Sequence, residues 1–363
     1  MSENTNTTKR RSAIQIMGSL IGLVKPLLHI MLAAIILGTL GYLCAIFLTI
    51  LAGQVIMHGL LTGVAGMIVP VDNMWRVFTP VKTIITVMIV IAVLRGILHY
   101  VEQYCNHFIA FKLLAIIRHK VFAALRKLCP AKLEGRDKGN LISIITTDIE
   151  LLEVFYAHTI SPIAIATLTS IIMVIFIGRY HWLAGLLALV AYLIVGVVIP
   201  MWNGKRGSQK GMEFRTNFGE LNSFVLDSLR GLDETIQYGQ GEKRKEQMSE
   251  HSKNLAGMQE SLSKMEGSQR SFTNMVILLA SFGMLALTIW LYDKGAMGFE
   301  GILTCTIAMM GSFGPVVALS SLSNNLNQTL ASGERVLSLL EETPLVEEIP
   351  GDVETSGAES MEH

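Results

Sequence analysis

Residues 81–128 read VKTIITVMIVIAVLRGILHYVEQYCNHFIAFKLLAIIRHKVFAALRKL, a stretch that contains no proline. Roughly the first 20 of these residues are apolar enough for a bilayer, and the part from Phe111 to Leu128 alternates basic and apolar side chains at helical spacing. At 1.5 Å per residue, one helix over this stretch is roughly 70 Å long, more than twice the ~30 Å hydrocarbon core. The stretch therefore predicts a membrane span that continues as a rod into water, where something outside the bilayer can push on it.

The composition excludes an ordinary soluble domain. Of the 363 residues, 51% are hydrophobic and 16% are charged, and the mean hydropathy is +0.49. Six stretches are long and apolar enough to cross a bilayer, namely residues 27–52, 81–101, 157–178, 181–202, 272–292 and 299–322. We therefore expect an all-α membrane protein with six transmembrane helices.

The orientation follows from the distribution of basic residues, although the formal net charge is zero. If the N-terminus is cytoplasmic, the outward loops carry few basic residues: Arg76, Lys82, Arg179 and Lys294. Nearly all the others, Arg95 apart, fall on inward segments, as the positive-inside rule requires. Both termini are therefore expected in the cytoplasm, and the basic clusters are interpreted as topology signals and contacts to membrane lipids, not as a nucleic-acid site.

Outside the spans the chain is divided by composition. Residues 1–19 are expected to be a disordered cytoplasmic tail, residues 20–341 a six-helix membrane domain, and residues 342–363 an acidic linker. Two inward turns are expected, at about 131–139 and 231–241, each between long helices that extend from the spans. The four cysteines are scattered, so neither a zinc site nor a disulfide framework is indicated.

Three passages carry a resemblance to a known family: Arg118–Leu125 followed by Gly139-Asn140-Leu141 and Asp148, Gly231–Gly239, and Ala331–Leu340. In this order and spacing the chain resembles the membrane domain of ABC exporters (type IV fold). The resemblance implies alternating access by a dimer, driven by ATP, and two coupling helices that dock on a nucleotide-binding domain. The first would comprise Ala131, Lys132, Leu133, Glu134, Gly135, Arg136 and Asp137, and the second Asp233, Glu234, Thr235, Ile236, Gln237 and Tyr238.

A narrower resemblance concerns the second span. CydC-type half-transporters carry Arg-Tyr-x-Glu-Arg-x-x-x-His, and residues 99–107 read HYVEQYCNH, with His99 and Gln103 in place of the two arginines. This resemblance implies a CydD-like partner chain, or a homodimer, in a bacterial plasma membrane. It also implies a cargo such as a thiol (cysteine or glutathione) or haem. Any cargo contact that those arginines make in the family does not carry over.

The sequence contains no G-x-x-x-x-G-K-[ST] motif, so this chain is not expected to hydrolyse ATP. ATP and Mg²⁺ would be bound by a nucleotide-binding domain. We expect that this domain is absent because the chain is a fragment or a truncated product, and the alternative is a separate ATPase polypeptide.

Several polar side chains share one face of the second span. Arg95, His99, Glu102 and Asn106 follow one another at i, i+4, i+7 and i+11, and Gln103 belongs to the CydC-like motif. Ionisable residues at bilayer depth normally face a bundle interior, a polar pathway or a partner. The stripe is interpreted either as the lining of a translocation cavity or as an internal Arg95–Glu102 ion pair, and the two interpretations are compatible.

His107 lies about 80–100° round the helix from this stripe. A neutral imidazole in a membrane cavity can be an axial haem ligand, and the alternative is a hydrogen-bonded histidine at the lipid interface. Two other functions remain open: a multidrug, peptide or lipid exporter with the same fold, and a membrane module that senses haem or another ligand without transporting it.

Overall fold

The computed structural model describes residues 13–23, 25–63, 81–129, 141, 142 and 144–344. Within them, every regular element is a helix. Six of the helices are long and apolar enough to cross a membrane: Lys25–Met57, Lys82–Leu128, Ile144–Gly178, Trp182–Asn203, Gly241–Asp293 and Phe299–Leu319. The prediction of an all-α protein with six spans is confirmed.

The first two spans are nearly uninterrupted helices. A short helix α1 (Ala13–Leu23) and a 3-10 turn η1 (Lys25–Leu27) precede α2 (Leu28–Gly63), and the second span is α3 (Val81–Leu128). The fifth span lies in α11 (Gly241–Asp293). The sixth is divided into α12 (Phe299–Gly311) and α13 (Gly314–Leu340), and the break directly precedes Gly314-Pro315.

Spans three and four each contain a π-helical turn directly before a proline. Span three runs through η3 (Ile144–Asp148), α6 (Ile149–Phe155), η4 (Tyr156–Ile160) and α7 (Ser161–Gly178). Span four runs through α8 (Trp182–Leu193), η5 (Ile194–Val198) and α9 (Ile199–Arg230). Pro162 follows η4 and Pro200 follows η5. Proline clashes with the carbonyl four residues earlier, and a wider turn there relieves the clash, so both spans stay helical.

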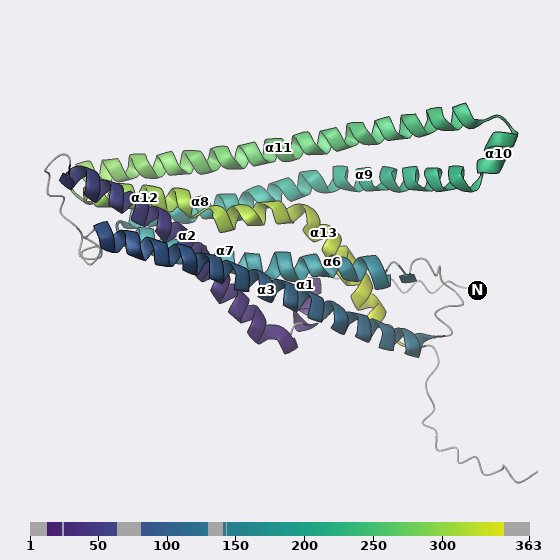
Figure 1. Ribbon diagram of the computed structural model, residues 1–363, viewed down its shortest axis with the longest axis horizontal. Coiled ribbons are helices and arrows are strands. Elements are labelled where there is room, and N and C mark those ends of the chain that lie inside the picture. Colours follow the sequence, from purple (N-terminus) through teal and green to yellow (C-terminus); the bar gives the residue numbers. More distant parts are fainter. Residues whose placement is uncertain (1–12, 24, 64–80, 130–140, 143, 345–363) are drawn as a thin grey trace, which may run out of the picture.

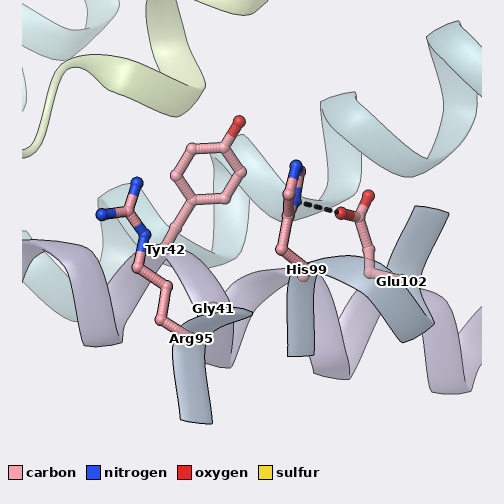
Figure 2. A pocket seen from close by; sticks show the side chains of 6 residues that line it. Gly41, Tyr42, Arg95, His99 and Glu102 are labelled. Carbon is pink, nitrogen blue, oxygen red and sulfur yellow. Dashed lines mark hydrogen bonds and ion pairs between the residues drawn. The ribbon is translucent and has the colours of Figure 1, made fainter. Parts of the chain in front are cut away.

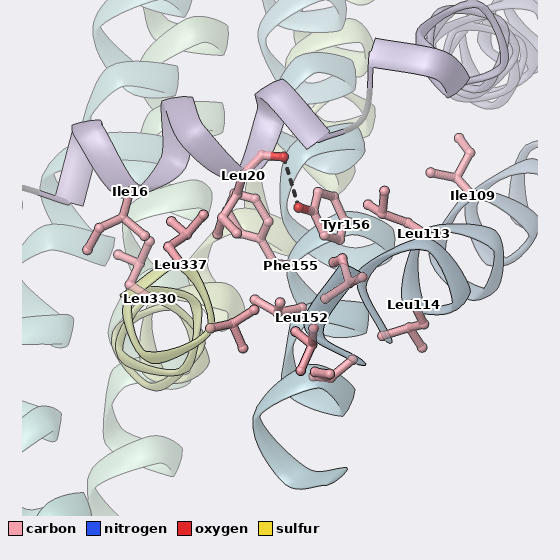
Figure 3. Packing of buried hydrophobic residues seen from close by; sticks show 14 of the residues in the cluster. Ile16, Leu20, Ile109, Leu113, Leu114, Leu152, Phe155, Tyr156, Leu330 and Leu337 are labelled. Carbon is pink, nitrogen blue, oxygen red and sulfur yellow. Dashed lines mark hydrogen bonds between the residues drawn. The ribbon is translucent and has the colours of Figure 1, made fainter. Parts of the chain in front are cut away.

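The prediction of a disordered tail over residues 1–19 is wrong for residues 13–19, which belong to α1. Ile16 and Leu20, four residues apart and so on one helix face, are 6% and 0% exposed. They pack against side chains of α6 and α13 (Figure 3). The hydroxyl of Tyr156 donates a hydrogen bond of 2.9 Å to the carbonyl oxygen of Leu20. This buried apolar face holds α1 in place.

Two arms extend from the spans and diverge toward one end of the molecule (Figure 1). The first, here called the packed arm, consists of the inner ends of α3 and α13 together with α1 and α6, which share one hydrophobic core. The second, the hairpin arm, consists of the inner parts of α9 and α11, which pack against each other and are joined by α10 (Leu232–Gln237). A second hydrophobic core lies among the spans.

The two predicted inward turns differ in what the structure describes. Residues 131–137, predicted as the first coupling helix, lie outside the described residues. The second prediction falls on α10, a short helix at the tip of the hairpin arm. The structure thus has a helix where the second one was predicted, and its docking role stays a prediction.

Candidate functional site

A polar cavity of about 220 Å³ lies between α2 and α3 (Figure 2). One wall is α2 and the other is α3, and the residues that line it are Gly38, Gly41, Tyr42, Arg95, His99 and Glu102. Three of the four residues of the predicted polar stripe are therefore brought together at one cavity. The stripe was predicted on α3 alone, and the contribution of α2 was not foreseen.

Glycine makes the close approach of these helices feasible. A Cβ atom at Gly38 would collide with Cδ1 of Ile165 on α7 and would lie 3.1 Å from Cγ of Glu102. Any larger residue at Gly38 would therefore displace Glu102 or Ile165. The glycine positions α2 against both neighbouring spans and leaves room for the Glu102 side chain beside the cavity.

Both carboxylate oxygens of Glu102 are engaged by neighbours on the same helix. Oε1 accepts a hydrogen bond of 2.8 Å from Nδ2 of Asn106, and Oε2 lies 3.1 Å from Nδ1 of His99. Glu102 and Asn106 are 5% and 4% exposed, whereas the His99 side chain is mostly exposed. Because Nδ1 of His99 makes this contact, the other ring nitrogen remains available to a ligand.

Arg95 lines the same cavity but does not pair with Glu102. Within the described ranges, the side chain that approaches the second oxygen of Glu102 is His99, and no ion pair joins Arg95 to Glu102. The interpretation of an internal Arg95–Glu102 ion pair is therefore wrong. Seven helical residues separate the two positions by about 10 Å along the axis, and His99 at i−3 reaches the carboxylate first.

Two of the predicted site residues lie outside the cavity lining. Gln103 is half-buried on α3 and does not line the cavity. His107 is also half-buried, and its ring centroid lies 5.8 Å from that of His158 on η4, edge to face, and 6.2 Å from that of Phe111. In the part of the chain that is described, no group of three or more His, Cys, Asp or Glu residues is placed to hold a metal ion.

A buried charged contact connects two distant segments of the packed arm. Asp148 in η3 is 4% exposed. It accepts a hydrogen bond of 3.0 Å from Oγ of Ser332, and its Oδ2 forms an ion pair of 3.1 Å with Nη1 of Arg335. Sequence reasoning placed all three in family-like motifs but did not join them. The contact joins the inner end of the third span to the inner part of α13, the last helix.

The tip of the hairpin arm presents apolar side chains to solvent. On and beside α10, Leu232, Ile236 and Tyr238 are 49%, 70% and 73% exposed. The turn that follows is well defined: Gly239 has a φ of +63°, which favours glycine, and the amide of Gln240 donates a hydrogen bond of 2.9 Å to the carbonyl of Thr235. Such a rigid apolar tip is suited to dock in a cleft of another domain.

Comparison with known proteins agrees with this geometry. The family described as "ABC transporter transmembrane region" matches residues 27–316. A "Probable ABC transporter ATP-binding/permease protein" of Haemophilus influenzae is 41% identical over 348 residues, which are 95% of this chain and 60% of the relative.

Two more distant relatives carry names that specify a cargo. The "Glutathione/L-cysteine transport system ATP-binding/permease protein CydC" of Haemophilus influenzae is 22% identical over 71% of this chain and 45% of its own length. An "ATP-dependent lipid A-core flippase" of Shewanella denitrificans is 23% identical over 69% of this chain and 42% of its own length. The chain thus spans 60% or less of each of these relatives.

Proposed function

This chain belongs to the ABC transporter transmembrane region family, and from that premise we propose that it is the membrane half of an ATP-driven exporter. ABC membrane domains act as dimers together with nucleotide-binding domains. We place the multi-pass chain in a bacterial plasma membrane with both termini in the cytoplasm, because the basic residues concentrate on the inward segments.

The observation that carries the proposal is the hairpin arm with its exposed apolar tip. The arm is an extension of spans four and five, so a force on α10 reaches the bilayer through two continuous helices. The exposed Ile236 and Tyr238 require a partner surface to bury them. Docking of α10 on an ATP-binding domain would let closure of that domain tilt the spans, as in rocking-type transport.

The test is a site-specific photo-cross-link from α10. A photoreactive amino acid at Ile236 is expected to capture an ATP-binding ABC domain in cells that make the assembled transporter, identified by mass spectrometry. The same amino acid at Lys294, in the outward loop after α11, is the matched control and should capture none. If Ile236 captured no ATP-binding domain, or if it were labelled from outside the cell, the proposal would fail.

For the cargo, we propose a small polar solute of the kind named for CydC, a thiol such as cysteine or glutathione. The support is the CydC-like run over residues 99–107, the 22% identity to CydC, and a cavity of about 220 Å³ lined by polar side chains. The rival cargo is a lipid, drug or peptide, and the flippase relatives represent it. Lipid acyl chains would need a larger, apolar cavity than this one. The test compares ATP-driven uptake of radiolabelled glutathione with that of labelled lipid in inverted vesicles. Uptake of glutathione alone would support the thiol, and uptake of lipid alone would support the rival cargo.

Haem is the second ligand that we propose, at His107. The observation that favours it is the imidazole of His158, 5.8 Å away between ring centroids, because two histidines can supply both axial ligands of one iron. The absorbance of haem added to the purified protein should change on binding and should revert in His107→Ala. Equal spectra for the two proteins would rule out His107 as a haem ligand. Haem binding without any transport would instead support the sensing module.

A further inference from the structure

The cavity between α2 and α3 contains an arginine that forms no ion pair within the described residues. Arg95 lines this cavity, and no ion pair in the described part of the chain involves it. In Figure 2 its guanidinium lies beside Tyr42, while Glu102 points to His99 on the other side. A guanidinium without an ion-pair partner is unusual in a membrane span, where charged side chains are normally paired or face a polar pathway.

The carboxylate of Glu102, which lines the same cavity, makes its contacts elsewhere. Glu102 is 5% exposed, and its two oxygens are taken by Asn106 at 2.8 Å and by His99 at 3.1 Å. Both oxygens thus contact other residues of α3, and in the described part of the chain neither forms a hydrogen bond or an ion pair with Arg95. Within the described residues, the guanidinium of Arg95 therefore has no carboxylate in direct contact with it.

The depth of Arg95 makes this charge costly. It lies thirteen residues beyond Lys82 on α3, roughly 20 Å along the helix, and its neighbours Val93, Leu94 and Ile97 are exposed apolar residues of a membrane span. A charged side chain inside a bilayer is normally paired or directed at a water-filled pathway. Arg95 is directed at the cavity, so its natural partner is an anion that enters there.

We propose that this cavity binds a small organic anion and that Arg95 binds its carboxylate. The proposal rests on the proposed function and specifies the charge class of its cargo. A volume of about 220 Å³ corresponds to about seven water molecules at liquid density, which suits a compact acid and not a phospholipid. A guanidinium binds a carboxylate through two parallel hydrogen bonds. The Tyr42 hydroxyl and the free ring nitrogen of His99 supply further polar groups for the rest of the solute.

Equilibrium dialysis of the purified chain in neutral detergent tests this with three pairs of compounds of similar shape, one member anionic and the other uncharged. The probes are radiolabelled propionate, succinate and benzoate, and the matched neutral compounds are propionamide, succinamide and benzamide. We expect saturable binding of at least one acid, at least ten-fold tighter than its amide. Arg95→Gln should weaken that binding at least ten-fold, whereas Arg95→Lys, which keeps the charge, should weaken it less than Arg95→Gln does.

The control is Arg118→Gln, an arginine on the same helix that faces Glu150 at 3.7 Å and lies outside the cavity. It should leave acid binding unchanged. The proposal is overturned if no acid binds saturably, if acids and amides bind equally, or if Arg95→Gln binds the acid as the unmodified chain does. Displacement of the acid by anionic lipid in nanodiscs would identify a headgroup site and would also overturn it.

The binding test of the anion proposal and the cross-linking test of the proposed function can fail independently of each other. The cross-link from Ile236 reports docking on an ATP-binding domain and does not depend on the charge of the ligand. A chain that cross-links but binds no acid refutes the anion proposal alone. A chain that binds acid but does not cross-link refutes the transport mechanism and leaves an anion-binding membrane protein.

Discussion

The two arms are built from similar long helices, yet they differ in what they bury. In the packed arm, Leu113, Ile117, Leu152 and Phe155 are fully buried within one core. In the hairpin arm, the described residues between 203 and 270 include none that is buried. A two-helix hairpin with both outer faces in water has little to stabilise it beyond its own helices. The difference indicates that the described part of the packed arm is stabilised by its own core, whereas we expect the hairpin arm to be covered by a partner.

The largest expected effect is the loss of a core side chain in the packed arm. Phe155→Ala removes a fully buried ring and should lower the free energy of unfolding by about 3–5 kcal/mol. Denaturant unfolding in detergent, followed by circular dichroism, measures it. The matched control is Leu229→Ala in the hairpin arm, where the side chain is 64% exposed and the change should stay within about 0.5 kcal/mol. Equal losses would contradict the comparison.

Removal of the buried contact at Asp148 should have the next largest effect. Asp148→Ala leaves Arg335 without its carboxylate and should cost about 1–3 kcal/mol. A double-mutant cycle of Asp148→Asn with Arg335→Gln should give a coupling of about 0.5–3 kcal/mol. The control cycle uses Glu260 and Lys264 on α11, an exposed ion pair of 2.6 Å, for which about 0.3–0.5 kcal/mol is expected. Coupling no larger at Asp148 than at Glu260 would refute a structural role for the buried contact.

A smaller effect is expected where α2 approaches α3. Gly38→Ala places a methyl group against Ile165 and Glu102 and should cost about 1 kcal/mol or somewhat more, because well-packed sites resist added volume. It should also weaken acid binding, since Glu102 borders the cavity. Gly96→Ala, with nothing within 4 Å of the added Cβ, is the control and should be neutral or slightly stabilising. Unchanged stability and binding in Gly38→Ala would show that the helices can separate at this point.

At the tip of the hairpin arm we expect the smallest effect on stability, together with the loss of ATP-driven transport. Ile236→Ser removes an exposed apolar side chain, so the unfolding free energy should change by less than about 0.5 kcal/mol. ATP-driven transport by the assembled protein should nevertheless be lost, because the side chain that docks is gone. Transport at the normal rate in Ile236→Ser would contradict a docking role for α10.

The sequence was sufficient for the spans and for the helix at the hairpin tip. Long apolar runs and turn residues such as Gly231 and Gly239 are local signals, and the structure follows them. The helix α1 was missed because two buried positions, Ile16 and Leu20, follow a strongly polar segment, so local composition concealed the amphipathic face.

The candidate site was predicted in part, for a related reason. Helical periodicity put Arg95, His99 and Glu102 on one face, but periodicity gives angles and not which atoms come within reach, so the wrong partner was chosen for Glu102. The sequence pattern of one helix does not show which residues of other helices contact it. Gly38 opposite Glu102, and His158 opposite His107, required the packing of three spans to be known.

If docking of α10 on an ATP-binding domain drives transport, ATP should move the hairpin arm relative to the packed arm. With the four native cysteines replaced by serine and the labelled chain diluted with unlabelled chain, spin labels at Lys127→Cys, at the inner end of α3, and at Gln237→Cys, on α10, report the distance between the arms within one chain. Pulsed electron–electron double resonance on the assembled transporter should give one distance distribution without nucleotide and a different one after ATP and vanadate are added. A single distribution that ATP leaves unchanged would contradict the account.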